Sequence, residues 1–168
     1  AIGSLAPPEV IVTHSFPGHI YLNKGEAGVV NLAIDKQKVD TDIPEWLILG
    51  FKLKIKQSSK IEEDHPDPDV TSLETEGAGF ISRTRMIESV CRHFLAWLNQ
   101  WEEEGFAPVI KMWNQRIEGE KKINLVNETN VKFLTVDENG FAVIEKNNKK
   151  IFLSPIEYFN EMKVITLK

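Results

Sequence analysis

The hydrophobic pattern is most regular between Ser82 and Gly105, where it predicts one long amphipathic helix. If each residue advances by about 100°, one face of this segment is apolar and the opposite face is charged. Ser82 or Thr84 is the expected N-cap, and Gly105 is the expected C-terminal stop. The predicted apolar stripe consists of Ile87, Val90, Cys91, Phe94, Leu98 and Trp101.

A second, shorter helix is expected from Pro108 to Ile117, because proline is favoured in the first turn of a helix. Two helices joined by a short loop form an αα-hairpin, whose apolar seam needs a sheet to cover it. Trp97, Trp101 and Trp113 are expected in this seam. Cys91 is expected to be a buried structural thiol on the same face.

Short β-branched and alternating segments predict a sheet upstream of the helices. A hairpin turn is expected at Asn23–Gly25, and Gly28 should mark a bulge or a close backbone approach. In the last strand, residues 46–49 are continuously apolar and should be buried on both faces, whereas residues 51–56 alternate and should present one face to water. The expected strands are Val10–Thr13, Ile20–Leu22, Ala27–Ile34 and Trp46–Lys56.

After Gly119 the pattern changes to period two with tight turns, which is typical of a small SH3-like barrel. A helical turn is also expected at Pro155–Phe159 and an edge strand at Met162–Leu167. The four expected strands are Lys121–Val126, Val131–Val136, Phe141–Glu145 and Lys149–Leu153.

Composition narrows the classes of function. The net charge of -5 over 168 residues argues against a nucleic-acid role, since the phosphate backbone favours a basic face. We expect no membrane span, because no apolar run reaches the roughly 18–20 residues required. The single cysteine excludes an internal disulfide and indicates a reducing compartment such as the cytoplasm. The opening residues 1–10 resemble the end of a helix followed by a loop, so we expect a further N-terminal part.

One succession of motifs resembles a known family. Thr71–Leu73 is followed by a glycine, then by a helix ending in Trp101–Phe106, then by a short helix with Trp113-Asn114. This order is similar to the C-terminal part of the catalytic domain of biotin/lipoate protein ligases, and the later strands are similar to the SH3-like domain of those ligases. The resemblance covers residues 6–159. It implies an α+β fold, with a mixed sheet and an αα-hairpin in residues 1–118 and an SH3-like β-barrel in residues 119–168.

The resemblance also implies a chemistry: ATP activates biotin or lipoate as an acyl-adenylate, and an acceptor lysine then attacks it. Such a site holds anions with cations and backbone N–H groups. The family's glycine- and arginine-rich loop has no counterpart in this chain. Its Lys-Trp-Pro-Asn-Asp-Ile motif corresponds to residues 15–20, where Ser15 occupies the lysine position and His19 the acidic position. His14 or His19 is a partial substitute, because imidazole is mostly neutral at pH 7.

A third family motif, Lys-x-x-Gly, corresponds to residues 25–28, with Gly25 at the lysine position and Lys24 one residue away. The family's Gly-x-Asn asparagine corresponds to Lys54. The resemblance therefore makes Lys24 and His19 the candidate catalytic residues. It makes Gly28, Lys52 and Lys54 the candidate cofactor-binding residues.

Other polar clusters have simpler interpretations. We interpret Asp64, His65, Asp67 and Asp69 as a solvated, proline-stiffened loop, because their spacing fits no EF-hand. His14 and His19 lack a third ligand nearby, so no metal site is predicted. The acidic run Glu102–Glu104 is either a solvated helix end or a contact for a basic partner.

Two hypotheses of function follow. In the first, the chain is a degenerate ligase-like domain that acts as a non-catalytic structural or interaction subunit, with no cofactor. In the second, it is part of a divergent ATP-dependent ligase that transfers biotin, lipoate or octanoate, and an upstream segment completes the nucleotide site. In both, we expect a protein partner or the missing N-terminal segment to cover an open sheet edge. The resemblance makes the mitochondrial matrix a second compartment to consider.

Overall fold

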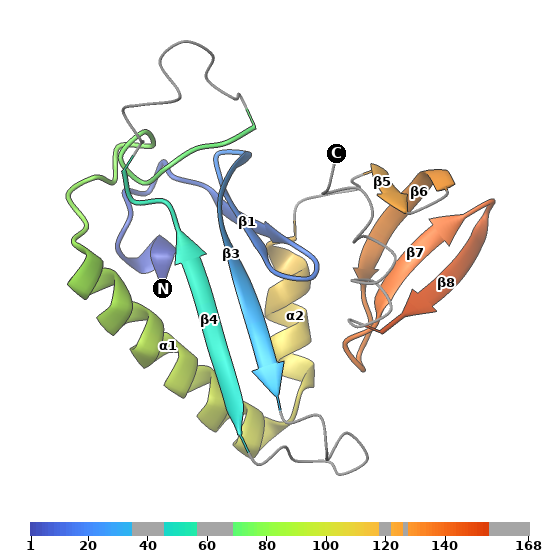
Figure 1. Ribbon diagram of the computed structural model, residues 1–168. Helices are drawn as coiled ribbons and strands as arrows, with labels where there is room; N and C mark the ends of the chain where they lie inside the picture. Colours follow the sequence, from blue (N-terminus) through green and yellow to red (C-terminus); the bar gives the residue numbers. More distant parts are fainter. Residues whose placement is uncertain (35–45, 57–68, 118–121, 126–127, 155–168) are drawn as a thin grey trace. The chain divides into compact units, whose positions relative to one another are not determined.

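The computed structural model describes residues 1–34, 46–56, 69–117, 122–125 and 128–154. These residues form two α-helices and two four-stranded antiparallel sheets, which confirms the α+β class (Figure 1). The elements in order are η1 (Ile2–Ser4), β1 (Val12–Ser15), β2 (His19–Leu22), β3 (Gly25–Ile34), β4 (Leu47–Leu53), α1 (Arg83–Glu104), α2 (Ala107–Gln115), β5 (Lys122–Leu125), β6 (Glu128–Val136), β7 (Ala142–Lys146) and β8 (Lys149–Leu153).

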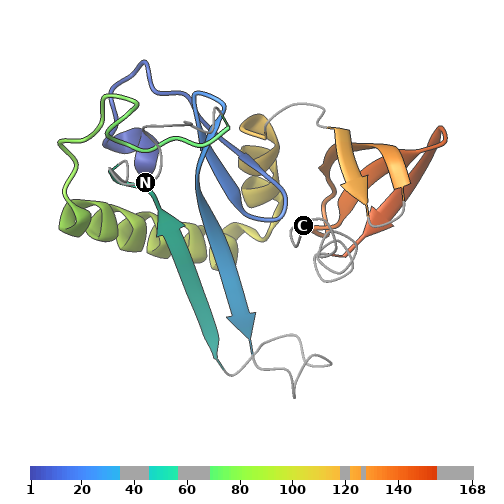
Figure 2. The same cartoon turned by 45° about the horizontal axis from the view of Figure 1, so that its top comes forward.

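The first sheet has the strand order β1-β2-β3-β4. The two longest strands of this sheet, β3 and β4, lie side by side in both views (Figures 1 and 2). They pair antiparallel from Gly28↔Leu53 to Ile34↔Leu47. The β2–β3 register shifts between Ile20 and Tyr21, which places a bulge next to Gly28. A Cβ built on Gly28 would lie 2.3 Å from the Lys52 carbonyl oxygen. Gly28 is therefore both a bulge and a close backbone approach, as predicted.

The turn between β2 and β3 is also as predicted. Asn23 and Lys24 have φ angles of 46° and 78°, the left-handed values that a two-residue hairpin turn requires. Leu22, just before the turn, is fully buried.

Helix α1 begins and ends where the sequence predicts. The Arg85 N–H donates to Ser82 Oγ at 3.2 Å, so Ser82 is the N-cap, and Gly105 closes the helix with a φ of 79°. Helix α2 begins at Ala107, with Pro108 in its first turn.

The predicted buried stripe of α1 is wrong by about a quarter turn. Ile87, Cys91 and Trp101 are exposed, so the prediction that Cys91 is a buried thiol is wrong, as is the core assignment of Trp101. Ser89 can lie inside because its hydroxyl donates to the Ala1 carbonyl at 3.2 Å. Val90, Phe94 and Leu98 of the predicted stripe are half-buried. The more buried stripe consists of Met86, Ser89, Val90, His93, Phe94, Trp97, Leu98 and Gln100.

The prediction that residues 46–49 are buried on both faces is also wrong. Trp46 is 47% exposed and Ile48 is 62% exposed, whereas Leu49 between them is half-buried. Trp46, Ile48, Gly50 and Lys52 alternate along this segment and are all exposed, so the described residues leave one face of β4 uncovered.

The second sheet has the order β5-β6-β7-β8, and its strands correspond to the four predicted ones, except that β6 begins at Glu128, three residues before the predicted Val131. Whether these strands close into a barrel stays a prediction. The expected elements at Pro155–Phe159 and Met162–Leu167, and the predicted boundary at 118/119, lie outside the described residues.

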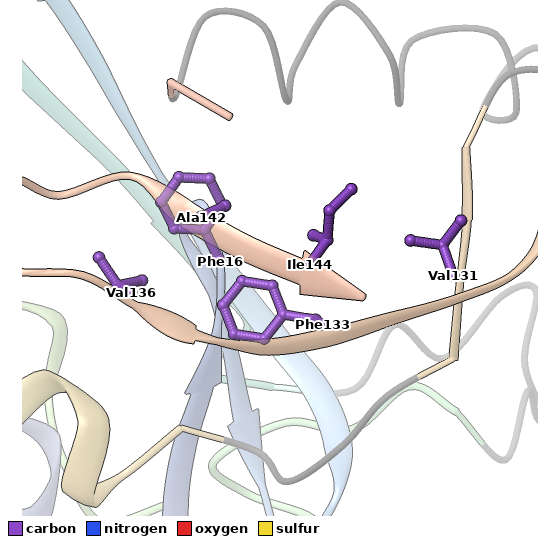
Figure 3. Packing of buried hydrophobic residues seen from close by; sticks show 6 residues of the cluster. All are labelled: Phe16, Val131, Phe133, Val136, Ala142 and Ile144. Atoms are coloured by element: carbon purple, nitrogen blue, oxygen red, sulfur yellow. The ribbon is translucent and has the colours of Figure 1, made fainter. Parts of the chain in front are cut away.

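Packing divides the chain into two compact units, of which one comprises Ala1, His14–Pro17 and Glu88–Lys168 and the other comprises Ile2–Thr13 and Gly18–Ile87. In the first unit, Phe16 lies in the core of the second sheet, with its ring 6.0 Å from that of Phe133 (Figure 3). Within the described part of the chain, neither helix has the length and apolar character needed to cross a membrane. The core cluster consists of Phe16, Val131, Phe133, Val136, Ala142 and Ile144.

Candidate functional site

The β2–β3 turn carries Lys24, the predicted catalytic cation, and it is held by side-chain hydrogen bonds. The Asn23 amide donates to Glu76 Oε2 at 2.7 Å, and the Thr71 hydroxyl donates to Glu76 Oε1 at 2.5 Å. The Asn23 side-chain Oδ1 also accepts from the Ile11 N–H at 2.9 Å. Lys24 itself is exposed. The turn therefore carries an exposed Lys24 next to Asn23, whose side-chain amide binds the Glu76 carboxylate.

His19, the other catalytic candidate, faces a carboxylate. Its Nδ1 lies 3.3 Å from Glu26 Oε2, at ion-pair distance but without the geometry of a hydrogen bond. The attraction exists only when His19 is protonated, and both side chains are partly exposed, so the pair is weak. An anion bound at His19 Nδ1 would therefore lie close to the Glu26 carboxylate.

Two glycines show how tightly this region is packed. A Cβ on Gly18 would lie 2.5 Å from the Val30 carbonyl oxygen, and a Cβ on Gly25 would lie 2.8 Å from Thr71 Cβ. Gly25 stands at the lysine position of the family motif. A lysine cannot return to that position unless Thr71 and the Glu76 hydrogen bonds move.

The predicted cofactor-binding residues lie on or beside the first sheet. His19 pairs with Val29, and Val29 pairs with Lys52, so these three residues form one row on the same face. Two strand spacings separate His19 from Lys52, which is about 10 Å. Lys24 lies in the turn before β3, five residues from Val29, or roughly 17 Å at the rise of an extended strand. The sheet thus aligns His19 with Lys52 and leaves Lys24 apart.

Lys52 is exposed and Lys54 is half-buried. The Lys54 backbone is fully used: its N–H donates to the Ala27 carbonyl at 2.8 Å, and its carbonyl accepts from the Leu73 N–H at 3.0 Å. Gly28 has no side chain that could contact a ligand; its role is to let β3 approach the Lys52 carbonyl oxygen closely. These arrangements leave Lys52 as the candidate best placed to meet a ligand on the open face.

The exposed face of the sheet that carries His19 and Lys52 continues along β3 and β4 toward an apolar end. Val29, Asn31 and Ala33 of β3 lie opposite Lys52, Gly50 and Ile48 of β4, and Trp46 continues the same face. One face of the sheet therefore has a cation at one end and exposed apolar side chains at the other.

His14 does not act as a cation. Its Nε2–H donates to the Trp113 carbonyl oxygen at 2.8 Å, and its ring lies 3.9 Å from the Trp113 ring. Burial lowers the pKa of His14, the hydrogen bond to Trp113 raises it in part, and the nearby Arg116 lowers it further. His14 is consequently neutral at pH 7 and belongs to the packing around α2.

This lowered pKa makes a prediction about stability. Below pH 6.5 or so the unfolded chain binds a proton that folded His14 resists, so folding is weakened as the pH falls. We expect the His14 ring to titrate below about 6.5 by NMR, and the urea midpoint to fall between about pH 7.5 and 5.5. The fall should be smaller in His14→Gln. An equal fall in both proteins would contradict the assignment.

Sequence reasoning missed Glu26, Thr71 and Glu76 as residues that shape this region. Thr71 enters the sequence analysis only as part of a family motif, and the two glutamates are not singled out there. No local pattern connects Asn23 with Glu76, because 53 residues separate them. Among the described residues, no group of three or more His, Cys, Asp or Glu side chains could hold a metal ion. Of the predicted acidic loop, only Asp69 is described.

The sequence as a whole matches a known family. A family profile described as "Biotin/lipoate A/B protein ligase family" matches residues 1–115. The chain belongs to the biotin/lipoate A/B protein ligase family. No curated protein matches the sequence of this chain significantly.

Solved structures agree with this assignment. A biotin protein ligase-like protein of unknown function from a Silicibacter species is 28% identical, with a TM-score of 0.75 over 91% of this ligase-family chain and 65% of that one. The apo biotin protein ligase of Aquifex aeolicus is 16% identical, with a TM-score of 0.65 over 84% of this chain and 62% of that one. The same enzyme in complex with biotin and ATP is 17% identical, with a TM-score of 0.64 over 84% and 58%.

The two Aquifex structures show a shared fold alone, given their low identity. The chain spans less than two thirds of the length of each of these three structures.

Proposed function

We propose that this chain is a ligase-derived domain that acts as a non-catalytic interaction subunit. The observation that carries the proposal is the packing at Gly25. The position where the family motif has a lysine is filled by a glycine whose Cβ would lie 2.8 Å from Thr71, so the fold has no room for the missing cation.

The charges around this position support the same conclusion. Glu26 faces His19, and Glu76 is fixed beside the β2–β3 turn by Thr71 and Asn23. A polyphosphate or acyl-phosphate at this end of the sheet would approach two carboxylates. Electrostatic stabilisation of such a group needs the opposite sign of charge.

The interaction role rests on the open face of β3 and β4. Trp46 and Ile48 are large, exposed and two residues apart on that face, with Ala33 beside Ile48. Exposed apolar clusters of this kind mark interaction surfaces, and a strand at the end of a sheet offers backbone groups for pairing. We propose that a protein partner, or a further segment of the same protein, covers this face.

The row of His19 and Lys52 favours a second candidate, a divergent ATP-dependent acyl-protein ligase. A carboxylate near Lys52 with an apolar chain extending toward Ile48 would suit biotin, lipoate or octanoate. The Aquifex ligase of similar fold has been solved with biotin and ATP. In this candidate, a segment from this protein or a partner completes the nucleotide site.

Calorimetry separates the two candidates. The intact natural protein is titrated with biotin, lipoate and octanoate, each with and without ATP and Mg²⁺. No heat in any combination supports the non-catalytic role. Binding that requires both the acyl group and the nucleotide contradicts it, and the ligase candidate then predicts that Lys52→Ala weakens binding more than Lys24→Ala.

The interaction role has its own test. In native extract of the source cells, the tagged protein should migrate in an assembly larger than its own 19.1 kDa chain. The Trp46→Glu/Ile48→Glu variant should leave that assembly while its circular dichroism spectrum stays unchanged. Arg83→Glu/Arg85→Glu makes the same change of charge at two exposed positions at the start of α1, away from this face, and serves as the control. An assembly that survives the Trp46/Ile48 changes would contradict the proposed surface.

A further inference from the structure

Helix α1 has an apolar strip on its outer side that the described residues leave uncovered. Ile87 is 47% exposed and Leu95 is 58% exposed, and Cys91 between them is also exposed. Arg83–Glu104 is one unbroken helix, so the spacing of four residues places these three side chains within about 80° of one another around its axis. Exposed apolar side chains that gather on one surface are typical of an interaction site.

The strip is symmetric about Cys91. Ile87 and Leu95 are each four residues from Cys91, and Thr84 and Leu98, the next residues on the same side of the helix, are each seven residues from it. Thr84 is exposed and Leu98 is half-buried. The spacing is therefore the same in both directions along the helix. We call these five residues the outer strip of α1.

We propose that α1 binds α1 of a second copy of this chain, antiparallel, with the two-fold axis at Cys91. Such a contact joins the same surface on both copies, so residues at equal distances on either side of the axis face each other. Ile87 of each copy faces Leu95 of the other, and the Thr84 methyl group faces Leu98. The small Cys91 side chains meet at the axis, where packed helices approach each other most closely.

Two charged side chains beside the outer strip favour the antiparallel direction. Glu88 and Arg92 are exposed along one edge of the strip, and among the described residues neither forms an ion pair within the single chain. With the axis at Cys91, Glu88 of one copy and Arg92 of the other differ in height by about 3 Å along the helix. The contact therefore contains this pair twice. In a parallel arrangement the charged edge would instead face the opposite edge, where Val90 and Phe94 are apolar.

This self-complementarity favours a second copy over other occupants. A different protein would require no symmetry about Cys91, whereas here both the apolar residues and the charges complement themselves. A nucleic acid would require a basic face, and Glu88 lies beside Arg92. Because a helix of 22 residues is only about 33 Å long, the contact is small, and we expect an association that depends on concentration.

Sedimentation velocity of the purified natural protein under reducing conditions tests this association. The average mass should rise with protein concentration toward twice that of the chain and then stop, because the dimer uses up the symmetric surface. Leu95→Glu should weaken association at least about tenfold, since it buries a carboxylate against Ile87. Its circular dichroism spectrum should stay unchanged, because Leu95 is exposed in the single chain. Ala96→Glu adds the same charge at an exposed position outside the outer strip, and should associate like the parent protein.

Exchange of the two charges tests the direction of the helices. Glu88→Arg alone places like charges opposite each other twice in the dimer, and should weaken association about tenfold. Glu88→Arg/Arg92→Glu makes the charges opposite again, and should recover the association of the parent protein. The position of the axis is tested with an added mild oxidant, which should join two copies through Cys91. The variant Cys91→Ser/Ala96→Cys, whose thiol lies outside the outer strip, should cross-link much more slowly.

A protein that stays monomeric at every concentration, as expected if another part of the natural protein covers α1, would overturn the proposal. Association of Leu95→Glu like that of the parent would overturn it too, as would a charge exchange that recovers nothing, or equal cross-linking of the parent and Cys91→Ser/Ala96→Cys. The proposed interaction role of β3 and β4 is separate. Trp46→Glu/Ile48→Glu should dimerise like the parent protein, because both residues lie outside α1, so failure of one proposal leaves the other standing.

Discussion

Replacing Phe16 by alanine is expected to lower the free energy of unfolding by about 3–5 kcal/mol. Phe16 is 8% exposed, and its ring lies among Phe133, Val136 and Ala142 in the core of the second sheet (Figure 3). Removal of the ring leaves a cavity that the surrounding strands can close only in part. Urea unfolding followed by tryptophan fluorescence measures the change.

Phe16 is also the aromatic residue in the stretch that corresponds to the family's Lys-Trp-Pro-Asn-Asp-Ile motif, residues 15–20. The result would decide whether this aromatic side chain stabilises the core or contacts a ligand. A core residue changes stability, whereas a ligand-contacting residue changes binding and leaves stability nearly intact. Phe80→Ala is the matched control, because Phe80 is 65% exposed and its loss should alter stability by less than about 0.5 kcal/mol. If Phe16→Ala were as mild as Phe80→Ala, the position of Phe16 in this core would be wrong.

Replacing Gly28 by alanine is expected to lower the free energy of unfolding by about 3 kcal/mol, the upper range for overpacking. The new methyl group would lie 2.3 Å from the Lys52 carbonyl oxygen. Because that atom belongs to the backbone of the neighbouring strand, the clash is relieved only if β3 and β4 separate locally. Urea midpoints and the loss of hydrogen-exchange protection in β3 and β4 measure the effect.

Gly50→Ala is the control within the same strand pair. Gly50 lies opposite Asn31 on β3, and a Cβ there would be 3.9 Å from the nearest atom, an ordinary contact. Its substitution should change stability by less than about 0.5 kcal/mol. Equal losses for Gly28→Ala and Gly50→Ala would mean that strand propensity, and not the close approach, sets the cost.

Several features of the fold could be predicted because their causes are local. The Ser82 hydroxyl caps α1 three residues away, and Gly105 ends the helix through its own backbone freedom. The turn at Asn23 and Lys24 follows from residues that tolerate a positive φ. Period-two alternation was enough to place β7 and β8 to within one residue.

The candidate site could be predicted much less well. The sequence suggested His14 or His19 as partial replacements for a lost lysine, but burial keeps His14 neutral and Glu26 faces His19. The ligand roles of Lys24, His19, Gly28, Lys52 and Lys54 stay predictions. What the structure adds is their grouping: His19 and Lys52 share a row, and Lys24 stands apart on a turn held by Glu76.

The sequence by itself determined the family, the α+β class and the order of helices and strands, because periodicity, caps and turns depend on neighbours within a few residues. Only the tertiary structure decided which faces are buried. Cys91 is exposed and Ser89 buried because contacts from distant residues choose the inner face of α1, and Trp46 stays exposed because no described residue covers that face of β4. The burial and the pKa of a side chain depend on contacts with residues far away in the sequence, and the local sequence does not specify those contacts.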